Sequence, residues 1–403
     1  MFKAQRKTRI YSSEDARLLA KRRLPRIIFD FVEGAAGREV GAARNQRSFD
    51  TVLLQPRVMA DVAERSLATK LLDRSYGLPV GIAPMGMCNL ACPGADKHLA
   101  EAAKTFDVPV CLSSAGSSTM EDMRKWAGER AWFQLYFGQS VDATLASATR
   151  AQNAGYDTLV LTVDVPQVSR RIRDLRNGFN FPFRMTARTF WDFARHPRWS
   201  VATLMAGVPS PQNFARDNSE APFDRHASRA GADWDFISVL RERWPGKLIV
   251  KGVTSPVDAK RIQALGADAI YVSNHGARQL DSAPPALRLL PLIRSSVGQD
   301  FPLLFDSGVR NGEDVVKALA LGADFVMIGR PALFALGAEG GPGLEGLLNC
   351  FARDISVSMA QLGVNSIEDL SPAVLFSDAL SENTNQPLTI AAPMRAAHGK
   401  QAR

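Results

Sequence analysis

The chain has 403 residues, of which 46% are hydrophobic and 22% are charged, a balance typical of a globular protein with a large core. No apolar run reaches the roughly 18 residues of a membrane-spanning helix, and the first residues lack the apolar stretch of a secretory signal. The four cysteines are too scattered for a disulfide scaffold or a zinc set, so we expect a cytoplasmic protein with reduced thiols and no metal site.

The net charge of +8 is concentrated in two segments of the chain. Residues 1–26 have a net charge of +7, residues 170–200 have +6, and the rest of the chain is net negative. Such local basic patches indicate a phosphate group or an anionic lipid surface as partner, and they argue against a protein that coats nucleic acid.

In chain order, residues 1–70 are predicted to form a helical extension that precedes the first strand. Eight short β-rich apolar runs follow, at Val80–Pro84, Val108–Ser114, Ala131–Phe137, Thr158–Asp164, Leu248–Val253, Ala269–Asn274, Pro302–Gly308 and Phe325–Arg330. Alanine-rich segments with helical period alternate with them, for example His98–Thr105, Asp142–Ala154, Pro256–Leu265 and Gly312–Leu321. Alternation of this kind predicts an α/β fold with a parallel sheet, and eight units favour a closed (β/α)₈ TIM barrel within residues 71–380. A doubly wound open sheet is the alternative, and residues 381–403 are predicted to be a tail.

One segment, residues 170–235, interrupts the fourth strand–helix unit and is far longer than an ordinary connection. It leaves from the carboxyl end of a strand, which is the face that carries the chemistry of barrel enzymes. We therefore expect this insertion to have a function.

The residues at or just past the ends of the predicted strands are mostly polar or charged, with a few glycines and apolar residues among them. They are Met85 and Gly86 after Pro84, then Ser113, Ala115, Gln134, Tyr136, Thr162, Asp164, Arg171, Lys251, Ser273, His275, Arg278, Asp306, Gly308, Arg310, Gly329 and Arg330. Polar groups are costly inside a closed barrel unless they are paired or lie at the rim. Their convergence on one rim indicates a functional site.

The stretches "DSGVRNG" and "IGRP" follow the seventh and eighth strands, where barrels commonly bind phosphate. Glycines let backbone amides approach an anion, and Arg310 and Arg330 would add charge. The alternative is a pair of ordinary turns with solvated arginines.

A second group of charges predicts redox chemistry on a small acid. His275 can take a proton near neutral pH, Asp164 can stabilise the imidazolium, and Lys251 would be partly buried beside an anion or an electron-rich ring. Arg278 and Arg171 can grip a carboxylate. Because no G-x-G-x-x-G motif opens a strand–helix unit, flavin mononucleotide (FMN) fits better than a nicotinamide cofactor.

These residues resemble the FMN-dependent 2-hydroxy acid oxidases and dehydrogenases, a family that includes glycolate oxidase, lactate dehydrogenase and mandelate dehydrogenase. The likeness runs from "KRRLPRIIFDFVEGAAG" through "FQLY", "LTVDV", "VKGV", "SNHGARQLD" and "DSGVRNGEDVVKALALGAD" to "IGRP". It implies oxidation of an L-2-hydroxy acid to a 2-keto product on FMN.

By this resemblance His275 would be the base, and Asp164 would support it when protonated. Arg278, Arg171 and Tyr136 would bind the substrate, and Lys251 would stabilise the reduced flavin. The remaining positions imply contacts with FMN from Pro84, Met85, Gly86, Ser113, Gln134, Thr162, Ser273, Asp306, Gly308, Arg310, Gly329 and Arg330.

The chain departs from the family pattern at the substrate. Phe31, in "FDF", stands where the family usually has a tyrosine that helps to hold the carboxylate, and Ala115 stands where glycolate oxidase has a tryptophan. Met85 and Asn311 also replace common residues of the family. A wider pocket, or a substrate that is an ester or lactone, would follow.

The basic part of the insertion mixes arginines with large aromatic residues, and "TARTFWDFARHPRWSVATLM" resembles the membrane-associating segment of the bacterial lactate and mandelate dehydrogenases. This predicts peripheral attachment through residues 170–215 to the cytoplasmic face of the cell membrane, with electrons passed to quinone. A flexible active-site lid is the alternative for the segment.

The family implies a homotetramer. The alternative functions are a soluble oxidase that makes hydrogen peroxide and a catalytically altered flavin-binding barrel.

Overall fold

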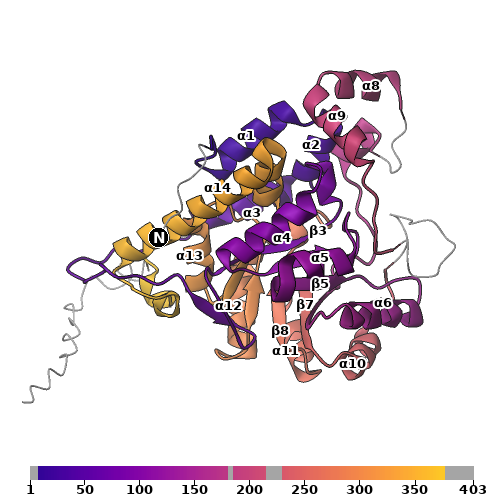
Figure 1. The fold of residues 1–403 in the computed structure, drawn as a ribbon. Helices are drawn as coiled ribbons and strands as arrows, with labels where there is room; N and C mark the ends of the chain where they lie inside the picture. The colour runs from indigo at the N-terminus through magenta and orange to yellow at the C-terminus, as the bar shows by residue number, and fades with distance from the viewer. Residues whose placement is uncertain (1–7, 180–184, 215–228, 377–403) are drawn as a thin grey trace, which may run out of the picture.

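A closed barrel of eight parallel strands forms the centre of the molecule (Figure 1), in a computed structural model that describes residues 8–179, 185–214 and 229–376. The strands are β3 (Val80–Met85), β4 (Val110–Ser113), β5 (Ala131–Leu135), β6 (Thr158–Thr162), β7 (Lys247–Val253), β8 (Ala269–Val272), β9 (Leu303–Phe305) and β10 (Phe325–Ile328). They pair in sequence order, and β10 closes the barrel by pairing with β3. The predicted barrel is confirmed, and the open sheet is not formed.

Helices alternate with the strands around the barrel. They are α4 (Ala95–Phe106), α5 (Met120–Ala127), α6 (Val141–Asn153), α10 (Trp234–Arg243), α11 (Pro256–Ala264), α12 (Ala286–Val297), α13 (Gly312–Ala320) and α14 (Arg330–Leu362). Five of them begin after an N-cap side chain that accepts a hydrogen bond from the first turn: Thr119, Ser140, Asp233, Ser255 and Asn311. Such caps satisfy amides that have no partner within the helix and so mark where each helix begins.

Three helices precede the barrel, as predicted for the N-terminal extension: α1 (Ser13–Arg23), α2 (Arg26–Glu33) and α3 (Val40–Asp50). Helix α1 packs along α14, and α3 lies against the turn that follows β8. An antiparallel hairpin, β1 (Thr69–Leu71) with β2 (Arg74–Tyr76), then leads into the first barrel strand. Its residues Leu71 and Tyr76 pack into the barrel interior.

The long insertion between β6 and β7 contains three helices before α10: α7 (Ile172–Asn177), α8 (Ala187–Ala194) and α9 (Pro197–Ala206). Helices α8 and α9 lie together at one edge of the molecule, beside α2 (Figure 1). The Asp192 carboxylate of α8 accepts hydrogen bonds from the amides of Arg26 and Ile27 at the start of α2, at 3.1 and 3.2 Å. Parts of the insertion (180–184 and 215–228), residues 1–7 and the predicted tail, residues 381–403, lie outside the described residues.

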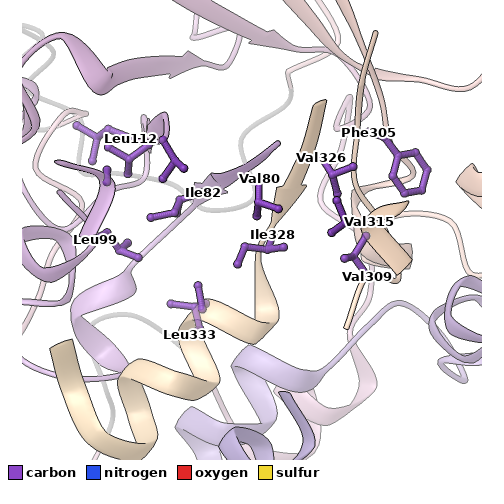
Figure 2. Close-up of a cluster of buried hydrophobic side chains, with 14 of the residues drawn as sticks. Val80, Ile82, Leu99, Leu112, Phe305, Val309, Val315, Val326, Ile328 and Leu333 are labelled. Atoms are coloured by element: carbon purple, nitrogen blue, oxygen red, sulfur yellow. The ribbon is translucent and has the colours of Figure 1, made fainter. Parts of the chain in front are cut away.

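The core has two layers because strand residues alternate between the interior and the outer face of the barrel. The interior layer includes Trp132, Tyr271 and Phe325. In the outer layer, Val80, Ile82, Val326 and Ile328 of two neighbouring strands meet Leu99, Val315 and Leu333 of the covering helices (Figure 2). Short 3₁₀ helices complete the chain: η1 (Cys88–Leu90), η2 (Gly128–Arg130), η3 (His275–Ala277), η4 (Ile367–Asp369) and η5 (Pro372–Val374).

Across the described ranges, every helix is too short or too polar to span a bilayer.

Candidate active site

A cavity opens at the carboxyl ends of the barrel strands and gathers most of the predicted site residues. Its walls include Phe31, Pro84, Met85, Gly86, Ser113, Ala115, Tyr136, Arg171, Lys251, His275, Arg278, Asp306, Gly308, Arg310, Gly329 and Arg330. Asp164, Gln134 and Ser273 lie behind the wall, each hydrogen-bonded to a wall residue. Thr162, the last residue of β6, pairs in register with Lys251 of β7. Sixteen predicted residues thus line one cavity, as the convergence of strand ends led us to expect.

His275 comes from η3, a turn in which three successive residues have left-handed backbone. The φ angles of His275, Gly276 and Ala277 are 58°, 61° and 59°. Such angles are unfavourable for residues with a β carbon, so the surroundings must hold the turn in place. Ser273 Oγ accepts from the His275 amide at 3.0 Å, and Ser307 Oγ accepts from the Gly276 amide at 3.1 Å.

The His275 imidazole pairs with Asp164, which lies just past the end of β6. Nδ1 of His275 lies 2.9 Å from Oδ1 of Asp164. Burial lowers the pKa of His275 below 6.5, and the charge of Asp164 only partly offsets this effect. For Asp164, burial is outweighed by His275 and Lys251, so its pKa is also lowered. At neutral pH the pair is therefore a neutral imidazole beside an ionised carboxylate, with the free imidazole nitrogen available as a base.

Lys251 is a buried cation at the end of β7, held from three sides. Its Nζ donates to Ser273 Oγ at 2.9 Å, lies 3.4 Å from Asp306 Oδ2, and sits 4.7 Å from the centre of the Tyr271 ring. Burial opposes its charge, but Asp306 and Asp164 outweigh burial and raise the pKa of Lys251. The lysine is thus a fixed positive charge in the cavity wall.

Two arginines of the rim are held by backbone carbonyls at the end of α2. Arg278 Nη1 donates to the carbonyls of Phe31 and Gly34 at 3.1 and 2.6 Å, and Arg330 Nη2 donates to the same Gly34 carbonyl at 2.8 Å. The carboxyl end of a helix has free carbonyls and a partial negative charge, which stabilises cations. Helix α2 of the N-terminal extension therefore completes the rim.

The loops after β9 and β10 have the properties of an anion site. Arg310 and Arg330 are both half-buried; desolvation lowers the pKa of Arg310 to about 10, and desolvation and nearby cations lower that of Arg330 to about 9. A bound anion would relieve this cost. Gly308 has a φ of 107°, and a β carbon there would lie 2.6 Å from the Asn45 carbonyl oxygen. The glycine lets the loop pass close to α3.

Among the buried polar atoms that have no hydrogen-bond partner within the described residues, two lie on neighbouring strands near the rim. They are Nε2 of Gln134 in β5 and Oγ1 of Thr162 in β6. Unpaired buried polar atoms are uncommon and often mark the place of a ligand. A flat heterocycle with carbonyl and imide groups, carrying a phosphate toward Arg310 and Arg330, suits these atoms together with Lys251. The site therefore fits FMN.

The substrate side of the cavity is aromatic and apolar. Phe31 stacks on Phe179 with ring centres 4.4 Å apart, and the Arg278 guanidinium lies 5.5 Å from the centre of the Phe31 ring. Val165, Val168 and Pro211 extend the apolar wall. Ala115 lines the same cavity and contributes only a methyl group.

Several lining residues were not predicted. Arg229, whose guanidinium lies 4.6 Å from the centre of the Tyr136 ring, and Phe179 both belong to the long insertion. Both residues lie far along the chain from any predicted strand end, so the sequence pattern could not predict that they line the cavity. Ser307 stood inside the "DSGVRNG" motif, but its role in holding the η3 turn depends on its left-handed backbone, with φ at 88°.

Comparison with known proteins gives consistent results. A family model described as FMN-dependent dehydrogenase matches residues 20–377. The chain is 36% identical to (S)-mandelate dehydrogenase of Pseudomonas putida over 377 residues, which is 92% of this chain and 95% of that one. It is 35% identical to L-lactate dehydrogenase of Pseudomonas syringae pv. syringae (strain B728a) over 379 residues, covering 91% and 98%. The crystal structure of the monotopic membrane protein (S)-mandelate dehydrogenase superposes with a TM-score of 0.85 at 36% identity, covering 92% of this chain and all of that one. The chain therefore belongs to the FMN-dependent dehydrogenase family, among its 2-hydroxy acid dehydrogenases.

Proposed function

We propose that the enzyme oxidises an L-2-hydroxy acid to the 2-keto acid and passes the electrons to a membrane quinone. The observation that carries the proposal is the His275–Asp164 pair, joined at 2.9 Å, in the same cavity rim as the buried cation Lys251. A neutral base, a carboxylate that stabilises its protonated form and a fixed positive charge suit the removal of two electrons and two protons, one of which the base takes.

One group of site residues is proposed to act on the substrate, and a second group is proposed to hold the cofactor. His275 takes a substrate proton, and Asp164 stabilises the imidazolium that forms. Arg171 and Arg278 hold the carboxylate. Tyr136, whose pKa burial and Asp164 raise, stays protonated and donates a hydrogen bond.

FMN, when bound, accepts the two electrons of the oxidation. It would be held by Pro84, Met85, Gly86, Ser113, Gln134, Thr162, Lys251 and Ser273 around the ring, and by Asp306, Gly308, Arg310, Gly329 and Arg330 around the phosphate. Lys251 supplies positive charge where negative charge develops on the cofactor.

We propose an aromatic or branched substrate rather than a very small one. Support comes from the Phe31–Phe179 stack, from Val165 and Val168, and from the small side chain of Ala115. The P. putida relative is a mandelate dehydrogenase, and mandelate carries an aromatic ring on the hydroxyl-bearing carbon. An apolar wall favours such a ring by burying its surface.

Anaerobic mixing of the flavoprotein with a substrate panel tests this proposal. The panel contains lactate, glycolate, the two enantiomers of mandelate, a mandelate ester and a lactone, and the signal is loss of the yellow flavin absorbance. We expect (S)-mandelate-like acids to bleach the flavin faster than lactate or glycolate. Bleaching by esters and lactones alone would contradict the carboxylate clamp, and bleaching by none of the panel would contradict the proposed reaction.

We propose quinone as the electron acceptor because the surface of α8 and α9 has the properties of a membrane-binding surface. Large apolar side chains are exposed there, among them Trp191 at 62%, Leu204 at 77% and Met205 at 84%. Arg188 of α8, Arg198 of α9 and Arg195 between the two helices are also exposed. Apolar and basic residues on one surface suit the headgroup region of an anionic bilayer. We place the enzyme at the cytoplasmic face of the membrane, where quinone is accessible.

The second candidate is an oxidase, and a direct measurement separates the two. Turnover under air with stoichiometric hydrogen peroxide would favour the oxidase. Turnover that depends on an added short-chain quinone, with little peroxide, would support the dehydrogenase. We also propose a homotetramer from the family resemblance, which light scattering on the detergent-solubilised enzyme checks.

A further inference from the structure

Two buried asparagines join the N-terminal extension to the turn that bears His275. Asn45 of α3 donates from Nδ2 to Asn274 Oδ1 at 2.8 Å, and Asn274 Nδ2 donates back to Asn45 Oδ1 at 2.8 Å. Asn45 is 1% exposed and Asn274 is 7% exposed. The two amides thus form a closed, reciprocal pair away from water, although their residues are 229 positions apart in the chain.

Asn274 transmits this contact to the turn. Its Oδ1 also accepts from the Ala277 amide at 3.1 Å, and its Nδ2 donates to the Pro284 carbonyl at 3.1 Å. Asn274 therefore spans η3, in which His275 and Ala277 both have left-handed backbone. The extension touches the turn a second time, since the Ala36 amide donates to the Ala277 carbonyl at 2.9 Å.

A turn with two non-glycine residues in left-handed backbone persists only where its surroundings enforce it. Ser273 and Ser307 hold it from within the barrel, and Asn274 holds it from the side of the extension. Without Asn45, the buried Asn274 amide would lose two of its four hydrogen bonds, and it would be free to rotate toward other partners. The bond from Ala277 would then be lost.

We propose that Asn45 is a positioning residue for His275: by fixing the Asn274 amide it holds the left-handed turn that aims the imidazole into the cavity. The inference rests on the proposed role of His275 as the base. Asn45 contacts neither substrate nor cofactor in this role.

Replacement by aspartate makes the role testable because a carboxyl group has the shape of the amide. A protonated Asp at position 45 accepts from Asn274 Nδ2 and donates to Asn274 Oδ1, as the amide does. The ionised form has no donor and repels Asn274 Oδ1. Burial raises the pKa of such a carboxyl, and so do the nearby carboxylates of Asp281, which caps α3, and Asp306, which binds Ser307. Arg330, which donates to the Gly276 carbonyl at 3.0 Å, and Lys317, which donates to the Phe49 carbonyl at 3.3 Å, act in the opposite direction.

The experiment measures the anaerobic rate of flavin reduction by saturating substrate in the holoenzyme, between about pH 5.5 and 8.5. The variants are Asn45→Asp, Asn45→Ala and, as control, Ser48→Ala. Ser48 is buried on the same helix, and its hydroxyl donates only within that helix, to the Asn45 carbonyl. Each rate is divided by the wild-type rate at the same pH, which removes the titration of His275 itself.

We expect Asn45→Asp to be slower than wild type by ~10-fold or more at high pH and to approach the wild-type rate as the pH falls. Asn45→Ala should show a deficit that does not change with pH, and Ser48→Ala should show a ratio near one throughout. FMN affinity, measured by fluorescence, should be unchanged in Asn45→Asp at low pH.

A ratio for Asn45→Asp that stays constant with pH would overturn the inference. A deficit that disappears when FMN is saturating would also overturn it, because the role would then belong to the phosphate loop next to Asn45. If Asn45→Asp does not fold, Asn274→Asp tests the pair from the other side and should recover in part on acidification, because its single O–H can donate to Asn45 Oδ1 but not also to the Pro284 carbonyl. Failure of the proposed function is seen separately, as normal flavin reduction in His275→Ala.

Discussion

The imidazole of His275, which we propose as the base, is positioned by its turn, and its pKa is set by its surroundings. Strand β8 ends at Val272, and the left-handed residues that follow redirect the chain so that the imidazole lines the cavity. Burial keeps the imidazole neutral, and Asp164 at 2.9 Å stabilises its protonated form. A base for this reaction must be neutral before the proton transfer and stabilised after it, and the two effects meet these needs.

Replacement of His275 by alanine should leave FMN bound but slow its reduction. The imidazole is not among the groups proposed to hold the cofactor, so the variant should purify yellow. Loss of a positioned base costs about 10² to 10⁴ in rate. We expect anaerobic flavin reduction to fall by ~10²-fold or more, as measured by stopped-flow absorbance. Near-normal reduction would contradict the role of His275, and colourless protein would show that the residue serves FMN binding instead.

The pH dependence follows from the direction of the His275 shift. The imidazole is active when neutral, so kcat/KM should be lost as the pH falls through its pKa, which lies below 6.5. Asp164 raises this pKa, and its replacement by asparagine should therefore move the acid limb to lower pH. The plateau rate should also fall by ~10²-fold, because the imidazolium loses its partner. Initial rates across the pH range test both effects, and a limb that moves to higher pH would contradict the assignment.

At the scale of the element, the ends of strands and helices determine which charges meet. The carbonyls of Phe31 and Gly34 at the end of α2 hold Arg278, and the Gly34 carbonyl also holds Arg330. The same helix begins at amides capped by Asp192 of α8. Helix α2 thus links the surface proposed to meet the membrane with two arginines of the site.

The loop after β9 depends on Gly308. Alanine there would be strained at a φ of 107°, and its β carbon would lie 2.6 Å from the Asn45 carbonyl oxygen. We expect Gly308→Ala to weaken FMN binding by ~10-fold or more, as measured by quenching of FMN fluorescence. Gly298→Ala is the matched control, because Gly298 has a φ of 88° but no atom within 4 Å of the added carbon. Equal FMN affinities in the two variants would contradict a specific role for the loop.

At the scale of the whole molecule, the surface formed by α8 and α9 exposes several large apolar side chains. Helices α8 and α9 stand at one edge (Figure 1) and expose Phe190, Trp191, Val201, Leu204 and Met205. Contiguous exposed apolar side chains on a folded protein usually mark a surface that meets a partner or a membrane. The exposed arginines on the same helices favour an anionic bilayer.

Introducing charge on this surface should release the enzyme from membranes without changing its chemistry. We expect the double variant Leu204→Glu, Met205→Glu to bind anionic vesicles at least ~10-fold more weakly in a flotation assay, because two large apolar side chains are removed from the interface. Its rate of flavin reduction by soluble substrate should stay normal. The control is Val257→Glu with Leu292→Glu, which alters exposed residues of α11 and α12. Retention of vesicle binding in the first variant would place the attachment elsewhere.

The sequence alone determined the barrel and most of its rim. Each apolar run had the length of a strand, and parallel strands bring their carboxyl ends to one face, so Lys251, His275 and Arg330 could be assigned to one site although they lie in different units. The glycine and arginine content of the two loop motifs after β9 and β10 likewise predicted an anion site there.

Only the tertiary structure decided how these side chains are held. The amide pair of Asn45 and Asn274, the α2 carbonyls that bind Arg278, and the stack of Phe179 on Phe31 each join segments more than 100 residues apart. No local pattern encodes such contacts, because they depend on where the N-terminal extension and the long insertion pack against the barrel. Strand periodicity, a local property, therefore predicted which residues reach the rim, whereas packing between distant segments determined their orientation and charge state.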